Sequence, residues 1–228
     1  MSETHPCILS ASILAADFAA LGADITHALQ AGTDYIHFDV MDHHFVPNLS
    51  IGAVVCESLR KAHITAPIDV HLMVTHPEQY IEPFAKAGAN MILFHPETTH
   101  NATALIERIE SLGMQAGIVI NPDKTLDLPA ELITRLQLVL VMSVYPGFAG
   151  QTFLPDTLPK LTQIRAQLDA VNPAIWLGID GGIKTHNLGE VAQHGANFFV
   201  IGSGLFQTHD YAETVTQCRR AYDRGKTC

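Results

Sequence analysis

The chain has 228 residues and a formal net charge of −10; 47% of its residues are hydrophobic and 16% are charged. This composition predicts a large buried core, and the negative charge argues against a nucleic-acid partner because no cationic surplus is left to neutralise phosphates. No apolar run approaches the length of a membrane span, the first residues lack the pattern of a secretory signal, and four scattered cysteines are typical of reduced, structural thiols. We therefore expect a cytoplasmic protein with no membrane partner.

Short apolar runs alternate with amphipathic stretches along the whole chain. The apolar runs are continuous, which is typical of parallel strands that are buried on both faces. We predict strands at residues 7–12, 35–41, 68–74, 91–95, 116–120, 138–144, 175–180 and 198–201. Helices are predicted between them, for example at residues 18–30, 77–86, 103–111, 158–168 and 211–222.

Eight strands and about eight helices in one uninterrupted alternation predict an α/β protein with a single (β/α)8 TIM-barrel domain over residues 1–228. A doubly wound open sheet is the structural alternative. It is disfavoured because no Gly-rich dinucleotide fingerprint follows the first predicted strand. No linker or low-complexity tract indicates a domain boundary.

Histidine and aspartate side chains occur near the ends of three predicted strands. His37 and Asp39 share one face of their strand, as do Asp69 and His71, because residues two apart point the same way. One such residue alone is more often structural, but TIM barrels carry functional residues at the carboxyl ends of their strands. We interpret Asp69, one layer deeper, as a buried partner of a ligand. The candidate ligands of one divalent ion (Zn, Fe(II), Mn or Co) are His37, Asp39, His71 and Asp180.

Two glycine-bearing segments are predicted in loops: residues 145–151 after the sixth strand and residues 202–204 after the eighth. Glycines allow backbone N–H groups to converge on an anion, and TIM barrels commonly hold a phosphate in the loops after strands seven and eight. Each segment alone could be a tight turn, but the pair, with two further glycines between them, favours a phosphate cradle. The predicted substrate-binding residues are Ser12, His71, Gly147, Phe148, Ala149, Gly150, Asp180, Gly181, Gly182, Gly202 and Ser203.

Methionines and further histidines are also predicted near the strand ends. Core filling is the default role of methionine, and an apolar roof over the reacting carbon is the alternative interpretation for three of them. The other histidines of these loops, including His95, are interpreted as solvated or as core residues with satisfied hydrogen bonds. The three methionines are Met41, Met73 and Met142.

With these residues in view, the chain resembles the ribulose-phosphate 3-epimerase family from Leu9 to about Phe206. The resemblance implies a TIM barrel of the ribulose-phosphate-binding type, a catalytic divalent metal ion on the four candidate ligands, and Asp39 and Asp180 as the acid/base pair. It also implies a homo-oligomer. The segments that carry the resemblance are 10–18, 37–42, 45–48, 69–74, 94–97, 142–144, 146–148, 150–151, 180–182 and 202–203.

The activity that this resemblance implies is 3-epimerisation of a small ketose phosphate. It would interconvert D-ribulose 5-phosphate and D-xylulose 5-phosphate, in the pentose phosphate pathway, through a 2,3-enediolate. The chain departs from the usual family pattern at four positions: Tyr145 replaces an Asn, Ala149 a phosphate-loop Gly, His43 a small or amide residue, and Gly178 a common Glu.

Three alternatives stay open at this point. The Gly-Phe-Ala-Gly segment at residues 147–150 also occurs in allulose-6-phosphate 3-epimerases. A phosphosugar lyase or decarboxylase could use the same barrel, although the decarboxylases carry an Asp-x-Lys-x-x-Asp motif and residues 37–42 contain no lysine. A non-enzymatic phosphosugar-binding protein would leave the paired aspartates without a purpose.

Overall fold

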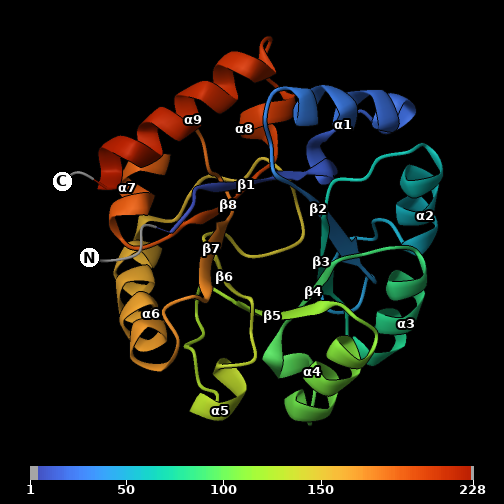
Figure 1. Cartoon of the computed structure of the whole chain (residues 1–228), viewed down its shortest axis with the longest axis vertical. Coiled ribbons are helices and arrows are strands. Elements are labelled where there is room, and N and C mark those ends of the chain that lie inside the picture. The colour runs from blue at the N-terminus through green and yellow to red at the C-terminus, as the bar shows by residue number, and fades with distance from the viewer. Residues whose placement is uncertain (1–4, 227–228) are drawn as a thin grey trace.

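The computed structural model describes residues 5–226, which form a closed barrel of parallel strands in the order β1 to β8. Figure 1 shows the strands at the centre and the helices in a ring around them. The TIM-barrel prediction is confirmed, and the open-sheet alternative is wrong. The strands are β1 (Ile8–Ser12), β2 (Tyr35–Met41), β3 (Ile68–Met73), β4 (Met91–Phe94), β5 (Gln115–Ile120), β6 (Leu138–Met142), β7 (Trp176–Asp180) and β8 (Phe198–Ile201).

Each strand is followed by a helix, and two helices, α8 and α9, follow β8. The predicted helices differ from these by a few residues at their ends, and the first also differs in kind. A separate 3-10 turn, Phe18–Ala20, precedes α1 because the side chain of Asp17 caps that turn, accepting a hydrogen bond from the backbone N–H of Ala19. The helices are α1 (Leu21–Gln30), α2 (Ala53–Lys61), α3 (Glu78–Lys86), α4 (Ala102–Ser111), α5 (Ala130–Ile133), α6 (Leu158–Val171), α7 (Leu188–Gln193), α8 (Ser203–Phe206) and α9 (Tyr211–Lys226).

Apolar side chains fill the molecule in two layers. The larger layer lies between the strands and the surrounding helices, and a second cluster, which includes Leu93, Leu140 and Phe198, fills the inside of the barrel. All six residues of β3 are buried, which explains why the apolar runs of the sequence are continuous rather than alternating. Because the interior of the barrel is packed, a site open to a ligand is expected at the carboxyl ends of the strands.

The register of neighbouring strands decides which of these polar side chains meet. Between β2 and β3, His37 pairs with Asp69 and Asp39 pairs with His71. Asp180, the last residue of β7, lies opposite Met142 of β6. The ends of β2, β3 and β7 therefore place acidic and imidazole side chains at one level of the barrel.

Two further features of the described residues concern their helices and their cysteines. Across residues 5–226, no helix combines the length and the apolar character that a membrane crossing requires. Cys7, Cys56 and Cys218 are unpaired, and burial raises the pKa of the Cys7 thiol to about 12 and those of Cys56 and Cys218 to about 11. These thiols are protonated at neutral pH and therefore unreactive. Cys228 lies outside the described residues. Residues 1–4, which the single-domain prediction also covers, lie outside them as well.

Candidate active site

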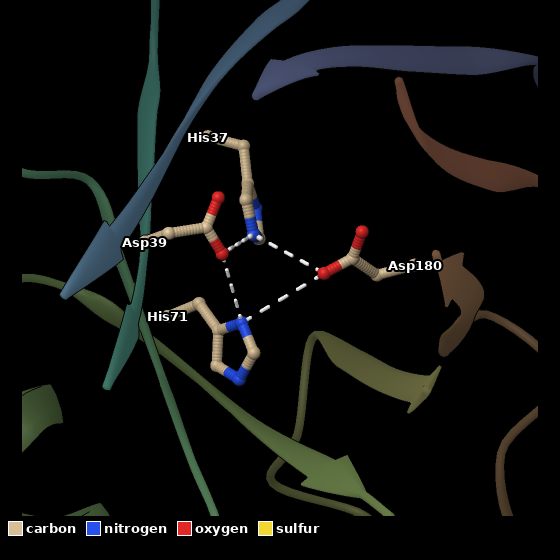
Figure 2. Close-up of side chains that lie close together, drawn as sticks. All are labelled: His37, Asp39, His71 and Asp180. Carbon is tan, nitrogen blue, oxygen red and sulfur yellow. Dashed lines mark ion pairs between the residues drawn. The ribbon is translucent and has the colours of Figure 1, made fainter. Parts of the chain in front are cut away.

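Four side chains from three strands point toward one centre at the mouth of the barrel (Figure 2). One donor atom of each lies within 4.8 Å of the others. Asp39 Oδ1 lies 3.3 Å from His37 Nε2 and 3.4 Å from His71 Nδ1. Asp180 Oδ2 reaches the same two nitrogens from the other side, at 3.8 Å and 3.9 Å. The convergence expected for these residues is present, and it places two carboxylates on opposite sides of two imidazoles.

The donor set fits a divalent metal ion. His37 Nε2 and His71 Nδ1 are buried and have no hydrogen-bond partner among the described residues. Leaving a buried polar atom unpaired costs about 1–3 kcal/mol, a cost that a ligand at the centre would offset. Two imidazole nitrogens and two carboxylate oxygens suit first-row divalent ions such as Zn, Fe(II), Mn and Co.

The two carboxyl groups have different proton affinities in the metal-free protein. Burial raises the pKa of Asp180 to about 7, with a further contribution from the negative charge of Asp39. Burial acts in the same direction on Asp39, but the neighbouring His37 and His71 outweigh it and hold the pKa of Asp39 well below its usual range. Asp39 is therefore ionised at neutral pH, while Asp180 carries a proton for a large fraction of the time.

The histidines differ in the same way. Burial lowers the pKa of His71 to about 4, so this imidazole is neutral at pH 7. Burial acts in the same direction on His37, but the negative charges of Asp69 and Asp39 outweigh it and raise the pKa of His37 well above its usual value. A metal ion at the centre would have to displace a proton from His37.

Asp69 holds His37 from behind. Its carboxylate is hydrogen-bonded to His37 Nδ1 and accepts a second hydrogen bond from the hydroxyl of Ser10 at 2.6 Å. All three side chains are fully buried. The interpretation of Asp69 as a buried partner of a candidate ligand is confirmed. Such a contact fixes the ring so that Nε2 faces the centre.

His71 faces the centre with its other nitrogen, Nδ1. Its Nε2 lies 2.9 Å from Nε2 of His95, the residue directly after β4. His95 is fully buried, so it is a core residue rather than a solvated one. This contact could not be predicted from residue spacing, because His71 lies on β3 and His95 directly follows the neighbouring strand β4, so that the two meet only in three dimensions.

Neighbouring serines fix the orientation of Asp39. The Ser12 hydroxyl donates to Asp39 Oδ2 at 2.7 Å, which leaves Oδ1 directed at the two imidazoles. The Ser50 hydroxyl donates to the backbone carbonyl of Asp39 and accepts from the N–H of Met41. Ser12 therefore holds the carboxylate in place, and its predicted contact with a substrate stays a prediction.

A pocket opens above the four side chains. Among the predicted substrate-binding residues, only His71 does not line it, because this side chain is buried beneath its floor. The pocket also brings together residues that were not singled out as contacts, Leu14, Pro146, Gln151 and Ile183 among them. The predicted residues that line it are Ser12, Gly147, Phe148, Ala149, Gly150, Asp180, Gly181, Gly182, Gly202 and Ser203.

Methionines form an apolar part of the same pocket. Met41, Met73 and Met142 all line it and are almost fully buried. Met41 and Met73 pack with Val46 in a small cluster of their own. Their burial is that of core residues, and their role as a roof over a substrate stays a prediction.

The loop after β2 contacts the loop after β6. The side-chain amide of Asn48 donates to the backbone carbonyl of Gly147 at 2.8 Å. Asp42 shapes the same loop by accepting hydrogen bonds from the backbone N–H groups of His44 and Phe45. The glycine-rich segment is therefore held by a residue almost one hundred positions earlier in the chain.

Two of the unusual residues have a structural explanation. Among the described residues, only His43 and His63 combine a side chain with positive φ, so Ala149 keeps an ordinary backbone that accepts its methyl group. A Cβ on Gly178 would lie 2.7 Å from a methyl group of Leu140 and 3.0 Å from one of Leu138. Apolar side chains thus fill the space beneath Asp180 where a glutamate is common in the family.

Comparisons with known proteins place these features in one family. Residues 8–206 match the sequence model of the Ribulose-phosphate 3 epimerase family. The chain belongs to the ribulose-phosphate 3-epimerase family. It is 47% identical over 212 residues to ribulose-phosphate 3-epimerase of Escherichia coli (strain K12), covering 93% of this chain and 94% of that protein. It is 49% identical over 212 residues to ribulose-phosphate 3-epimerase of Buchnera aphidicola subsp. Acyrthosiphon pisum, covering 93% of each chain.

Solved structures with low sequence identity share the fold of this family member. One is 3-hexulose-6-phosphate synthase from Salmonella typhimurium, with a TM-score of 0.64, 13% identity, and coverage of 96% of this chain and 99% of that one. Another is the alpha subunit of tryptophan synthase from Legionella pneumophila, with a TM-score of 0.61, 14% identity, and coverage of 95% and 93%. At such identities the likeness shows the barrel alone.

Proposed function

We propose that this protein is an isomerase that interconverts D-ribulose 5-phosphate and D-xylulose 5-phosphate by inverting C3. The observation that carries the proposal is the placement of Asp39 and Asp180 on opposite sides of one cluster, from strands β2 and β7. Inversion at a carbon needs a base on one face and an acid on the other. Membership of the ribulose-phosphate 3-epimerase family supports the same reaction.

His37, Asp39, His71 and Asp180 would hold one divalent ion, which supplies Lewis-acid stabilisation of the charge that develops on the substrate oxygens. Asp39, ionised in the metal-free protein, would remove the C3 proton from one face and leave a planar 2,3-enediolate. Asp180, from the opposite side of the cluster, would deliver a proton to the other face. In the metal-free protein, burial and the charge of Asp39 raise the pKa of Asp180 to about 7. The reverse reaction exchanges these roles.

The pocket supports binding of the substrate's phosphate. The loops after β6, β7 and β8 contribute Gly147 and Gly150, Gly181 and Gly182, and Gly202 with Ser203 to one cavity. Backbone N–H groups at such glycines can turn toward an anion without a side chain in the way. Anchoring the phosphate would fix C3 between the two carboxylates and reduce the entropic part of the barrier. Met41, Met73 and Met142 would cover the reacting carbon.

Allulose 6-phosphate is the second candidate substrate. The Gly-Phe-Ala-Gly segment at residues 147–150 lines the pocket, and Tyr145, where the family usually has Asn, is exposed beside it. Competition between the pentulose and hexulose phosphates distinguishes the two activities. For the ribulose 5-phosphate activity, we further propose a place in the pentose phosphate pathway, a cytoplasmic location and a homo-oligomeric assembly.

Incubation of the metal-loaded protein with ribulose 5-phosphate in heavy water tests the function. We expect xylulose 5-phosphate that carries deuterium at C3, seen by NMR and mass spectrometry. Asp39→Asn and Asp180→Asn should each abolish epimerisation. Release of carbon dioxide would indicate a lyase, and tight binding without turnover would indicate a phosphosugar-binding protein; either result would overturn the proposal.

A further inference from the structure

The contact between His71 and His95 has a consequence for the candidate metal site. Both nitrogens in this contact are Nε2 atoms, 2.9 Å apart, and both rings are fully buried. At this separation one nitrogen must donate a proton and the other must accept it, since two donors would repel and two acceptors would not bond. The pair therefore has two possible arrangements, which differ in the tautomer of each ring.

Only one arrangement is compatible with a metal ion on His71. A neutral imidazole carries one ring proton, and a ligating nitrogen carries none. Because Nδ1 of His71 faces Asp39 at 3.4 Å and Asp180 at 3.9 Å, the proton must be on Nε2. In the other arrangement Nδ1 carries the proton, points at Asp39, and is unavailable to a metal.

The surroundings of His95 favour its role as the acceptor. If its Nε2 accepts from His71, the ring proton of His95 is on Nδ1, which lies 3.8 Å from Oε1 of Glu97. That oxygen is held by the side-chain amide of Asn121 at 2.8 Å. The ring of Phe45 packs on His95, with 4.8 Å between the ring centroids. Nδ1 of His95 has no hydrogen-bond partner among the described residues, but the nearby negative charge of Glu97 favours a proton on that nitrogen, which leaves Nε2 free to accept.

We propose that His95 is a positioning residue which keeps His71 in the Nε2–H tautomer, so that the Nδ1 lone pair is presented to the metal ion. This inference rests on the metal site of the proposed function and assigns a residue outside the four candidate ligands. His37 receives the corresponding support from Asp69, a carboxylate. The two candidate histidine ligands thus use different nitrogens and different kinds of partner.

The test compares zinc binding by His95→Leu and His95→Gln. Leucine fills the space beside Phe45 without an acceptor, whereas the glutamine amide can place an oxygen near the position of Nε2. Zinc affinity is measured by competition with a chromophoric chelator, and thermal unfolding without metal checks that each variant folds. We expect the dissociation constant to rise about 10- to 100-fold in the leucine variant and to stay within about threefold of wild type in the glutamine variant.

A second readout detects the proton itself. In ¹⁵N-labelled, zinc-loaded wild-type protein, the Nε2–H of His71 should show a coupling across the hydrogen bond to Nε2 of His95. Equal zinc binding by wild type and the leucine variant, or equal weakening in both variants, would overturn the inference. If the wild-type protein bound no zinc, the metal site of the proposed function would be wrong. If the wild-type protein and the leucine variant bound zinc equally well, only the proposed role of His95 would be wrong.

Discussion

Gly182→Ala tests the close packing of the turn after β7 against the loop after β6. Gly182 has a φ of +62°, a conformation that side chains disfavour. A Cβ at this position would lie 2.5 Å from the backbone nitrogen of Phe153 and 2.9 Å from the backbone oxygen of Gln151. Because both contacts are with backbone atoms, neither can move aside as the end of a flexible side chain does.

The expected loss of stability follows from the positive φ and from the close backbone contacts. The left-handed conformation costs about 1–2 kcal/mol in a residue with a side chain, and overpacking adds about 1–3 kcal/mol. Gly182→Ala should therefore lower the free energy of unfolding by about 2–5 kcal/mol. Gly150→Ala is the matched control, since Gly150 has a φ of +75° and no atom lies within 4 Å of its added Cβ. It should lose only about 1–2 kcal/mol.

Urea denaturation of the two variants and the wild type measures this difference. We also expect Gly182→Ala to bind substrate more weakly, because the substitution pushes apart two loops of the candidate phosphate pocket. A free energy of unfolding for Gly182→Ala within about 1 kcal/mol of the wild-type value would contradict this packing. Equal destabilisation of Gly150→Ala and Gly182→Ala would contradict it as well.

Three further predictions concern the loops and the metal. Asn48→Ala removes the hydrogen bond that this side chain donates to the carbonyl of Gly147. Since one such hydrogen bond contributes about 0.5–1.5 kcal/mol, the KM for substrate should rise about 2- to 13-fold. A change in kcat alone would contradict this expectation. Burial acts to raise the pKa of Asp42, but hydrogen bonds from Thr75 and the backbone hold it well below its usual range. Because the folded-state pKa is the lower one, the ionised carboxylate stabilises the fold above about pH 4 and this stabilisation is lost as the pH falls. The stability gap between wild type and Asp42→Asn, measured by urea denaturation, should therefore narrow from pH 7 to pH 3, and a constant gap would argue against it. Removal of metal by a chelator should lower the melting temperature, and added zinc should restore it. At a free zinc concentration one hundred times Kd, binding should stabilise the folded protein by about 2.7 kcal/mol. An unchanged melting temperature would count against the site.

Much of the fold could be predicted because parallel strands buried on both faces leave continuous apolar runs. All six residues of β3 are buried, and the predicted strand at residues 68–74 differs from it by one residue. Short or irregular elements were harder to predict. The 3-10 turn at Phe18–Ala20 depends on a cap by Asp17, and α5 is a single turn, Ala130–Ile133, too short to show helical periodicity.

The candidate site was predictable where strand geometry alone decides the neighbours. His37 and Asp39 share a face of β2, and the parallel register then places His71 beside Asp39. Contacts between loops far apart in the chain left no such pattern. Asn48 on Gly147 and His95 on His71 depend on how the loops and strand ends meet in three dimensions.

What occupies the space beside Gly178 could likewise not be predicted from the sequence. A missing glutamate could have left a space for water or another polar group beneath Asp180. In the structure, methyl groups of Leu138 and Leu140 lie so near that an added Cβ would contact them at 3.0 Å and 2.7 Å. Which side chains fill a barrel layer depends on the packing of several strands at once.

Hydrogen exchange by the two aspartate variants is the most direct test of the claim that Asp39 and Asp180 act on opposite faces of C3. Each variant, Asp39→Asn and Asp180→Asn, is saturated with zinc and incubated in heavy water with either ribulose 5-phosphate or xylulose 5-phosphate. We predict that each variant exchanges the C3 hydrogen of one epimer without inverting it, and that the two variants act on different epimers. Exchange of the same epimer by both variants, or inversion by either, would contradict the account.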